Sequence, residues 1–471
     1  MHSFNKIDLK ALSYFCEILG DDRVSTDASI LQKHASDETE DLVYPPEVVL
    51  FVATTEEISK VLAYCNEHHF PVTVRGGGTG LSGGALAIYG GVVLNMQGFN
   101  KILSIDEQNL QAIVEPGVIT EVLQNAVKEK GLYYPPDPSS KGTCFIGGNV
   151  SENSGGPRAV KYGVVKDYVL NLEVVLANGE IIWTGANVLK NATGFNLTQL
   201  MVGSEGLLGV ITKIVLKLIP YPDKNLLMLV PFPSAERACE AVAKIFQAGY
   251  TPSALEFMER DAIEWSLKFS TEPSVLPIGD SVQAHLLIEV DGKEDAVLMQ
   301  EIEGIASVLE QLGCDEILFA DNEAEKNRLW KLRRSVAEAV KAHSIYKEED
   351  TVVPRASLPL LLKKVKNLGK EYGFKSVCYG HAGDGNLHVN IVKGDLSDSQ
   401  WENDLPKAIH RLFEYVHELG GTISGEHGIG LVQKEYMPIV FNKTQLELMS
   451  GIKNLFDPNG ILNPGKVFPT C

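Results

Sequence analysis

In the first 220 residues, some apolar positions follow the spacing of a helix and others form short runs of β-type residues. This pattern predicts helices and short strands in alternation. One helix is predicted to end at Gly20, after apolar residues at helical spacing: Leu12, Phe15, Cys16 and Leu19. A second helix is predicted to begin directly after Thr54, because Thr54 and Glu57 have the spacing of a capping box. Its predicted apolar face comprises Ile58, Val61, Leu62 and Cys65.

Runs of β-type residues predict strands between and beyond these helices. They lie at 72–75, 92–95, 111–115, 169–176, 180–184 and 213–218. Asn178-Gly179 separates two of these runs, and an Asn-Gly pair in this position is typical of a β-hairpin.

Pro220-Tyr-Pro222 predicts a domain boundary, and a chain of 471 residues is too long for one hydrophobic core. Beyond it the glycine density falls, and the order strand, helix, strand appears twice. The segments lie at about 225–231, 234–248 and 253–258, then at about 283–290, 294–312 and 315–319. This order predicts an α+β domain whose sheet is covered by helices.

The charge balance limits the partners. The chain has 42 Lys and Arg against 61 Asp and Glu, a formal net charge of −19, which disfavours nucleic acid and anionic lipid. An anionic substrate therefore requires a local group of Arg or Lys. No apolar run reaches the roughly 18 residues of a membrane-spanning helix, and the N-terminus lacks the features of a signal peptide.

The seven cysteines are scattered and include no Cys-x-x-Cys pair. This argues against a disulfide framework, a zinc ribbon and an iron–sulfur cluster. The cysteine pattern therefore predicts a cytoplasmic protein.

The segment from Arg75 to Gly84 holds six glycines in ten residues and follows a predicted strand. Glycine allows positive φ and close approach to a ligand, and clustered N–H groups bind anions. The spacing fits neither the Rossmann fingerprint nor the P-loop. A pyrophosphate is the expected ligand, and an ordinary flexible loop is the alternative.

Further motifs make the pattern specific, at 135–149, 153–157, 161–163, 193–197, 203–212 and 462–466. Together with the first loop they resemble the PCMH-type (vanillyl-alcohol oxidase) superfamily of FAD proteins. Within it, the chain is similar to the branch of glycolate oxidase flavin subunits, D-lactate dehydrogenases and D-2-hydroxyglutarate dehydrogenases. The similarity extends from about Tyr44 to Phe468.

The resemblance implies an α+β fold with two domains. Residues 1–220, with a core from about 43, would form a PCMH-type FAD-binding domain of two subdomains. Residues 221–471 would form an α+β substrate domain with a largely antiparallel sheet. Its tail, from about 455 to 471, would return to the flavin.

The resemblance also implies which residues line the FAD. They are Arg75, Gly76, Gly77, Gly78, Thr79, Gly80, Leu81, Ser82, Pro136, Asp137, Thr143, Gly147, Gly148, Asn149, Ser154, Gly155, Gly163, Ile211 and Asn463. Some relatives attach FAD through a His in the first loop, which has none here, so the FAD is expected to be non-covalent. Cys144 lies near a cysteinyl attachment position of other relatives and is expected here to be a small buried residue.

Two short motifs, at 381–390 and 424–428, contain candidate metal ligands. A Gly-Asp-Gly turn is expected to bring His381 near His388. With Glu426 they would give three ligands and an open position, as in catalytic zinc, although core or surface histidines are the alternative. The resemblance implies a divalent metal, Zn or Mn, at these three residues.

The resemblance assigns further roles. His427 is expected to act as base, Asn390 to contact the substrate, and Arg355 to lie in or beside the site. Arg333 is expected to bind the substrate carboxylate, for which a guanidinium is suited, and a solvated helix face is the alternative.

Two positions bear on substrate choice. Ala337 and Glu348 align with a Thr and a Lys that help to hold the second carboxylate in hydroxyglutarate enzymes. A Glu would repel that carboxylate, which favours a monocarboxylate substrate.

These residues predict a FAD- and metal-dependent dehydrogenase that oxidises a small D-2-hydroxy acid, D-lactate or glycolate, by hydride transfer to flavin N5. The alternatives are a D-2-hydroxyglutarate dehydrogenase, the flavin-binding subunit of a multi-subunit glycolate oxidase assembly, and an oxidase that delivers electrons to O₂. Electrons are expected to pass to a separate acceptor: a quinone, an electron-transfer flavoprotein or an iron–sulfur subunit. Such a partner would allow a location peripheral to a membrane, and a homodimer is compatible with the sequence.

Overall fold

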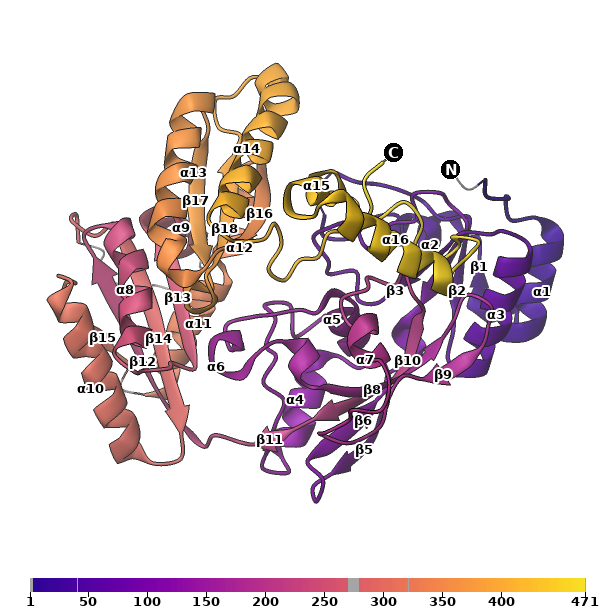
Figure 1. The fold of residues 1–471 in the computed structure, drawn as a ribbon, viewed down its shortest axis with the longest axis horizontal. Helices are drawn as coiled ribbons and strands as arrows, with labels where there is room; N and C mark the ends of the chain where they lie inside the picture. The colour runs from indigo at the N-terminus through magenta and orange to yellow at the C-terminus, as the bar shows by residue number, and fades with distance from the viewer. Residues whose placement is uncertain (1–2, 40, 270–278, 321, 471) are drawn as a thin grey trace. The chain divides into compact units, whose positions relative to one another are not determined.

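In the computed structural model, which describes residues 3–39, 41–269, 279–320 and 322–470, the chain passes repeatedly between two structural units (Figure 1). Unit 1 comprises Met1–Gly155, Val164–Tyr221 and Glu426–Cys471, and unit 2 comprises Gly156–Gly163 and Pro222–Gly425. One change of unit, after Tyr221, lies beside the predicted boundary. The short excursion into unit 2 and the return at Glu426, rather than at about 455, were not predicted.

Unit 1 contains a partly parallel sheet with the order β1-β2-β4-β3. Its strands are β1 (Val24–Ser25), β2 (Val48–Phe51), β4 (Val92–Asn95) and β3 (Val72–Arg75), and the last three are parallel. Helices α1 (Leu9–Leu19) and α3 (Thr55–Glu67) share one buried core with it. The predicted capping box of α3 forms, because the Thr54 hydroxyl accepts from the Glu57 N–H and the Glu57 carboxylate accepts from the Thr54 N–H.

A second sheet of unit 1 is antiparallel throughout, with the order β5-β6-β10-β8-β9. Its strands are β5 (Ile102–Asp106), β6 (Gln111–Val114), β10 (Val210–Lys217), β8 (Val169–Val175) and β9 (Ile181–Trp183). The last two form the predicted hairpin, and Gly179 in its turn has φ +86°.

Short elements connect these sheets. In unit 1 they are η1 (Asp21–Arg23), α2 (Ala28–Lys33), η2 (Met96–Gly98), α4 (Thr120–Lys128), β7 (Leu132–Tyr133), α5 (Ile146–Glu152), η3 (Val165–Asp167), α7 (Leu197–Met201), β11 (Ile219–Pro220), η7 (Lys434–Tyr436), α15 (Met437–Val440) and α16 (Lys443–Phe456).

The C-terminal segment of unit 1 returns to the edge of the first sheet. Leu462 bridges in parallel to Val72 on β3, the edge strand. The Val72 N–H donates to the Ile461 carbonyl at 2.8 Å, and the Asn463 N–H donates to the Val72 carbonyl at 2.8 Å. The C-terminus therefore extends the sheet beside the strand that leads into the first glycine loop.

A buried ion pair on α16 fixes this return. The Lys453 ammonium binds the Asp457 carboxylate and donates to the carbonyls of Leu207 and Leu462, at 2.8 and 2.9 Å. The Asp457 carboxylate accepts from the N–H groups of Ile461 and Leu462, at 3.1 and 2.7 Å.

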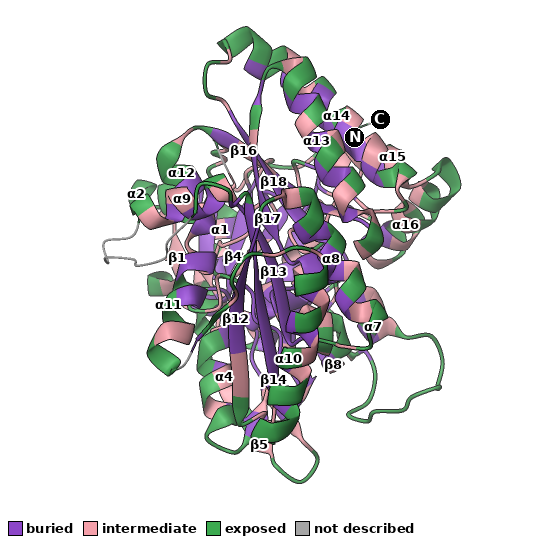
Figure 2. Cartoon of the chain, turned by 90° about the vertical axis from the view of Figure 1, so that its left-hand side faces the viewer, coloured by how far each residue is buried: buried purple, intermediate pink, exposed green. Residues whose placement is uncertain are grey.

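Unit 2 is a seven-stranded sheet in which every pairing is antiparallel, as expected. The order is β15 (Leu318–Phe319), β12 (Lys224–Phe232), β14 (Ala284–Gly292), β13 (Ala254–Glu259), β17 (Lys375–Gly380), β18 (Asn386–Val392) and β16 (Tyr346–Val352). Figure 2 shows β12, β14, β13, β17 and β18 buried along most of their length, while the helices expose their outer faces. The short edge strand β15 is exposed.

Helices cover both faces of this sheet. One face, which bears Tyr379, packs against α9 (Arg260–Phe269), α11 (Glu323–Arg334) and α12 (Val336–His343). The other helices are α8 (Ala235–Gln247), α10 (Asp295–Gln311), α13 (Leu358–Tyr372) and α14 (Leu405–Glu418). Short turns complete the unit: α6 (Ala159–Tyr162), η4 (Arg355–Ser357), η5 (Ala382–Asp384) and η6 (Gln400–Asp404). Both predicted strand–helix–strand segments are confirmed.

Within the described residues, no helix combines the length and apolar character needed to cross a membrane. The six cysteines of that part of the chain are free thiols.

Asp457→Asn is expected to destabilise unit 1, because it leaves the buried Lys453 ammonium without its carboxylate partner. Breaking a buried pair in this way costs about 3 kcal/mol of unfolding free energy, measurable by urea unfolding. Lys443→Met is the control, since Lys443 forms an exposed pair with Glu447 on the same helix and should change stability by less than about 0.5 kcal/mol. Equal effects of both substitutions would contradict this account of the buried pair.

Candidate functional site

The first glycine loop follows β3, as predicted, and exposes unsatisfied backbone donors. Among the described residues, the amides from Gly76 to Ser82 find no protein acceptor, whereas the Gly83 N–H donates to the Thr39 hydroxyl at 2.6 Å. A run of such N–H groups is the arrangement that binds a phosphate.

The second glycine loop packs directly against the first. A Cβ atom on Gly77 would lie 2.7 Å from the Thr143 carbonyl oxygen, and one on Gly147 would lie 2.4 Å from the Pro116 Cβ. Glycine is required at both positions because backbone meets backbone or a rigid ring there. The N–H of Gly147 also donates to the Pro116 carbonyl at 2.8 Å.

Other predicted FAD residues lie in the same unit. The buried Asn149 amide donates to the Thr120 hydroxyl at 2.6 Å, and the Ser154 N–H donates to the Asn149 carbonyl at 3.0 Å. Ile211 is buried in β10, whereas Gly163 ends α6 in unit 2. Cys144 is buried, as expected, beside the Thr120 hydroxyl.

Buried polar atoms near the first loop have no hydrogen-bond partner. They are Asp37 Oδ2, Arg75 Nη1, Ser82 Oγ and Glu152 Oε2. Buried polar atoms are nearly always paired, by protein, water or ligand. These atoms and the free loop amides fit the phosphates and polar edges of a bound dinucleotide.

Asn463 and Lys466, from the predicted 462–466 motif, reach this loop. Asn463 donates to the carbonyls of Glu205 and Gly84, at 2.7 and 3.2 Å, and Lys466 donates to the Gly84 carbonyl at 2.7 Å. Burial lowers the pKa of Lys466 to about 7. Burial, followed by the nearby Glu205, raises the pKa of Glu152.

Gly77→Ala is expected to reduce the bound FAD per chain strongly, because the new Cβ would push the two glycine loops apart. The ratio of flavin absorbance to protein absorbance in the purified protein measures this. Gly451→Ala, on α16 with no neighbour within 4 Å of its Cβ position, should keep the wild-type ratio. Full flavin content in Gly77→Ala would show that the close approach of the loops is dispensable.

In unit 2, the predicted turn brings His381 and His388 together. His381 directly follows β17, η5 forms the turn, and His388 lies on β18. Both side chains are buried, their ring centroids are 5.5 Å apart, and their potential ligand atoms lie within 4.8 Å of one another. The two rings can therefore bind one cation.

A carboxylate that the sequence analysis did not identify fixes His381. His381 Nδ1 lies 2.9 Å from both carboxylate oxygens of Glu256, which is fully buried on β13. With Nδ1 bound to a carboxylate, a metal at His381 would bind through Nε2, as in many histidine metal sites. An isolated charge within the apolar run 254–258 was the only signal in the sequence.

The same carboxylate binds Arg333. Arg333 Nη2 lies 2.6 Å from Glu256 Oε2, and the guanidinium lies over the Tyr379 ring, 5.0 Å from its centroid. Arg333 is only 4% exposed and its Nε has no partner, so the alternative of a solvated helix face is wrong.

Strand register places the remaining polar residues on the face that bears His388. Glu348 pairs with Asn390, and both Asp350 and Tyr379 pair with His388, so their side chains share one face. The Tyr379 hydroxyl donates to Glu348 at 3.0 Å, and Glu348 lies 3.4 Å from His388 Nδ1. Asn390 is fully buried, and neither amide atom has a hydrogen bond of normal geometry.

Two other predicted residues also belong to unit 2. The Arg355 guanidinium, on η4, lies over the ring of Phe246, 3.8 Å from its centroid. Ala337 packs against the apolar core that contains Trp330 and Tyr379.

Asp350 fixes the end of unit 2 that precedes Glu426. Its carboxylate accepts from the Gly425 N–H at 2.7 Å, from Ser424 Oγ at 3.1 Å and from Asn386 Nδ2 at 2.6 Å. Glu426 is the next residue, the first of the last segment of unit 1. Within unit 1, a Cβ on Gly155 would lie 2.8 Å from Glu426 Oε2. The metal and base roles of Glu426 and His427 stay predictions.

Two family models match the chain. The FAD binding domain matches residues 46–185, and the C-terminal domain of FAD linked oxidases matches residues 221–467. The chain therefore belongs to the FAD-linked oxidases, enzymes of the oxidase and dehydrogenase class with a PCMH-type FAD-binding domain.

Curated relatives cover nearly the whole chain. It is 37% identical to a D-lactate dehydrogenase of Anaerostipes hadrus, over 99% of this chain and 98% of that one. It is 40% identical to glycolate oxidase subunit GlcD of Bacillus subtilis, over 90% and 89%. It is 32% identical to a D-2-hydroxyglutarate dehydrogenase of Stutzerimonas stutzeri, over 95% and 96%.

Solved structures share the fold. The substrate-bound structure of p-cresol methylhydroxylase matches with a TM-score of 0.78 at 19% identity, covering 98% of this chain and 96% of that one. An alkyldihydroxyacetonephosphate synthase matches with a TM-score of 0.76 at 17% identity, covering 98% and 86%. The predicted PCMH-type fold is thereby confirmed.

Proposed function

We propose that this chain is a FAD- and metal-dependent dehydrogenase of a small D-2-hydroxy monocarboxylate, D-lactate or glycolate. The observation that best supports the proposal is the Glu256 carboxylate, which binds His381 and Arg333 together. A 2-hydroxy acid carries a carboxylate and a hydroxyl on adjacent carbons, so its recognition calls for an anion-binding group and a hydroxyl-polarising group side by side.

The carboxylate would bind at Arg333 and Asn390. Arg333 Nε and both amide atoms of Asn390 are buried without hydrogen bonds of normal geometry, and leaving such groups unmet is costly. A substrate carboxylate would accept from the guanidinium and from the amide nitrogen.

The hydroxyl would face the histidine pair. His381 and His388 fit a divalent cation, which would bind His381 through Nε2 because Glu256 binds Nδ1. Glu426 would complete the ligand set, since Asp350 holds the backbone of the residue before it. Bound at these residues, a cation would supply Lewis-acid polarisation of the hydroxyl, and bound FAD would supply the hydride acceptor.

His427 is proposed to take the hydroxyl proton, the task of a general base. It follows Glu426 directly in the chain, so base and metal ligand would be delivered by one short segment. Electrons would then leave to a separate acceptor, a quinone, an electron-transfer flavoprotein or an iron–sulfur protein. The relative named as a glycolate oxidase subunit supports the alternative that this chain acts within a larger assembly. A cytoplasmic location stays a prediction.

Glu348 is proposed to exclude substrates with a second carboxylate. It lies on the face shared with His388 and Asn390, 3.4 Å from His388 Nδ1. A dicarboxylate such as 2-hydroxyglutarate would bring a second negative charge towards this group. The relative named as a D-2-hydroxyglutarate dehydrogenase keeps that substrate as the alternative.

The purified holoenzyme is expected to reduce an artificial dye acceptor with D-lactate or glycolate faster than with D-2-hydroxyglutarate. Removing the Glu348 charge in Glu348→Gln should raise the ratio of kcat/KM for D-2-hydroxyglutarate to that for D-lactate by about tenfold, the effect of about 1.4 kcal/mol. Steady-state rates over a panel of 2-hydroxy acids measure both effects.

Lys224→Met is the control, since Lys224 forms a surface ion pair with Asp295 in the same unit and should leave the ratio unchanged. A wild-type preference for D-2-hydroxyglutarate would refute the assignment of a monocarboxylate, and no turnover with any 2-hydroxy acid would refute the proposed function.

A further inference from the structure

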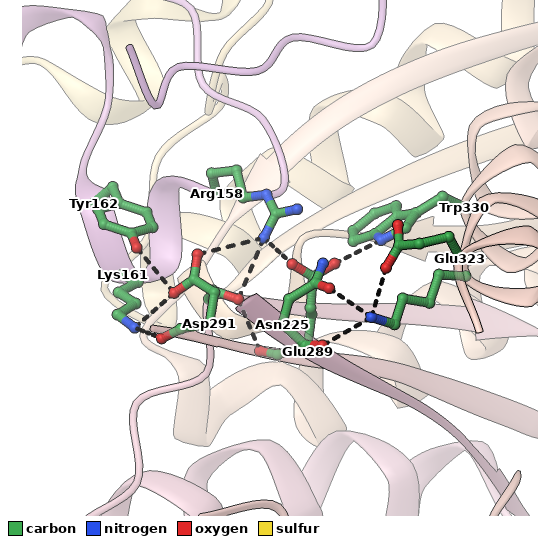
Figure 3. A network of polar contacts seen from close by, with 10 residues as sticks. Arg158, Lys161, Tyr162, Asn225, Glu289, Asp291, Glu323 and Trp330 are labelled. Carbon is green, nitrogen blue, oxygen red and sulfur yellow. Dashed lines mark hydrogen bonds and ion pairs between the residues drawn. The ribbon is translucent and has the colours of Figure 1, made fainter. Parts of the chain in front are cut away.

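A short segment between two FAD-loop motifs binds two acidic residues of β14. The segment is Gly156–Gly163, which belongs to unit 2 although its neighbours on both sides belong to unit 1. Figure 3 shows its side chains directed at Glu289 and Asp291. Asp291 accepts from Lys161 Nζ at 2.7 Å and from the Tyr162 hydroxyl at 2.8 Å, while Arg158 forms an ion pair with Glu289.

Glu289 joins Arg158 to helix α11. Its side chain is 1% exposed, and its second carboxylate oxygen accepts from the Trp330 indole N–H at 2.7 Å. The Arg158 guanidinium also lies over the Trp330 ring, 5.5 Å from its centroid. One buried carboxylate therefore binds a cation on one side and the helix on the other (Figure 3).

Glu289 and Glu256 are neighbours on one face of the sheet. Glu289 pairs with Ala254 on β13, and Glu256 lies two residues further along that strand, so both side chains point to the same face. Their partners on α11 are Trp330 and Arg333, three residues apart and therefore adjacent on the helix surface. Two buried carboxylates thus hold consecutive turns of one helix.

We infer that Arg158, Glu289 and Trp330 are positioning residues that hold Arg333 in its substrate-binding position; this inference rests on the proposed function. Hydrogen bonding of Trp330 to Glu289 fixes the turn of α11 that precedes Arg333. Arg158 supplies the positive charge that balances Glu289. Without Arg158, a buried carboxylate lacking its counter-charge would compete with the substrate for the Arg333 guanidinium.

The test compares holoenzymes that differ at these residues. Trp330→Phe and Arg158→Met should each raise the KM for D-lactate about tenfold, the usual worth of a hydrogen bond to a charged group, with kcat changed less than about twofold. The dissociation constant of pyruvate, followed by the perturbation of flavin absorbance, should rise by the same factor without any turnover.

Lys161→Met is the matched control. Lys161 belongs to the same segment, and among the described residues its hydrogen bonds and ion pair go to Asp291 on β14 rather than to α11. If the segment needed only to be docked on the sheet, Lys161→Met and Arg158→Met would weaken pyruvate binding equally, and that result would overturn the inference. We expect Lys161→Met to bind pyruvate within about twofold of wild type, the range of an ordinary partly exposed pair.

A double-substitution cycle separates positioning from a direct role. If Trp330 acts through Arg333, then Trp330→Phe should add little to Arg333→Met, whereas independent effects would multiply and contradict the inference. Should Trp330→Phe fail to retain FAD, the double variant Arg158→Met/Glu289→Gln keeps an acceptor for the indole N–H and removes the uncompensated charge, so it should bind pyruvate within about twofold of wild type. A loss as large as that of Arg158→Met alone would contradict the inference. A wild type that binds pyruvate without oxidising any 2-hydroxy acid would refute the proposed function alone.

Discussion

The Glu256 carboxylate, fully buried in the middle of the seven-stranded sheet, is the constraint on which the candidate site depends. Burying a carboxylate is costly unless it is paired and hydrogen-bonded. Glu256 satisfies this requirement with Arg333 from α11 and with His381 from the β17–β18 turn. A potential anion-binding group and a potential metal ligand are therefore held at a fixed spacing by a single side chain. The position of each follows from the need to compensate the same charge.

The neighbouring carboxylates extend the same principle. Asp350 fixes the backbone at Gly425 and the Asn386 amide, and Glu289 binds Trp330 and Arg158. In each case a buried acid on a strand orders a segment that lies outside the sheet. The buried carboxylates of the sheet therefore determine where helix α11 and the segment at Gly425 bind to it.

Unit 1 relies on a different constraint, the absence of side chains. Gly77 and Gly147 allow backbone segments to come closer than any Cβ would permit, and the amides of the first loop remain open for a phosphate. The returning C-terminus extends the four-stranded sheet of unit 1 by pairing with Val72 on β3, the strand that leads into the first glycine loop. Loop geometry and sheet edge are thus set by backbone contacts rather than by ion pairs.

Local patterns in the sequence were sufficient for much of the fold. The capping box at Thr54, the hairpin at Asn178-Gly179 and the turn that joins His381 to His388 each depend on residues close together in the chain, and each forms as predicted. The FAD-binding domain was predicted from the family resemblance. Of the residues that the resemblance assigned to the substrate, Arg333 binds the same carboxylate as His381, and Asn390 lies on the same strand as His388.

What the sequence could not supply depends on strand pairing. Glu256 meets His381 only because β13 and β17 are adjacent, although 125 residues separate the two side chains in the chain. Arg158 and Glu289 are likewise far apart in the chain and meet only in the fold, and their contact helps to place Gly156–Gly163 in unit 2. Composition and spacing carry no information about such pairings. Arg355, expected in or beside the site, has its guanidinium over Phe246, while its backbone N would lie 3.3 Å from a Cβ on Gly385, in the turn between the two histidines. Its role in the site stays a prediction.

The central claim is that one carboxylate serves both the metal ligand and the carboxylate-binding arginine. The most direct test is to measure, in Glu256→Gln, the affinity for Zn or Mn together with the KM for D-lactate. We predict that metal affinity falls about 10- to 100-fold, as when the carboxylate partner of a ligating histidine is lost, and that the KM rises while the FAD content stays at the wild-type level. A Glu256→Gln enzyme with wild-type metal affinity and wild-type KM would contradict the account.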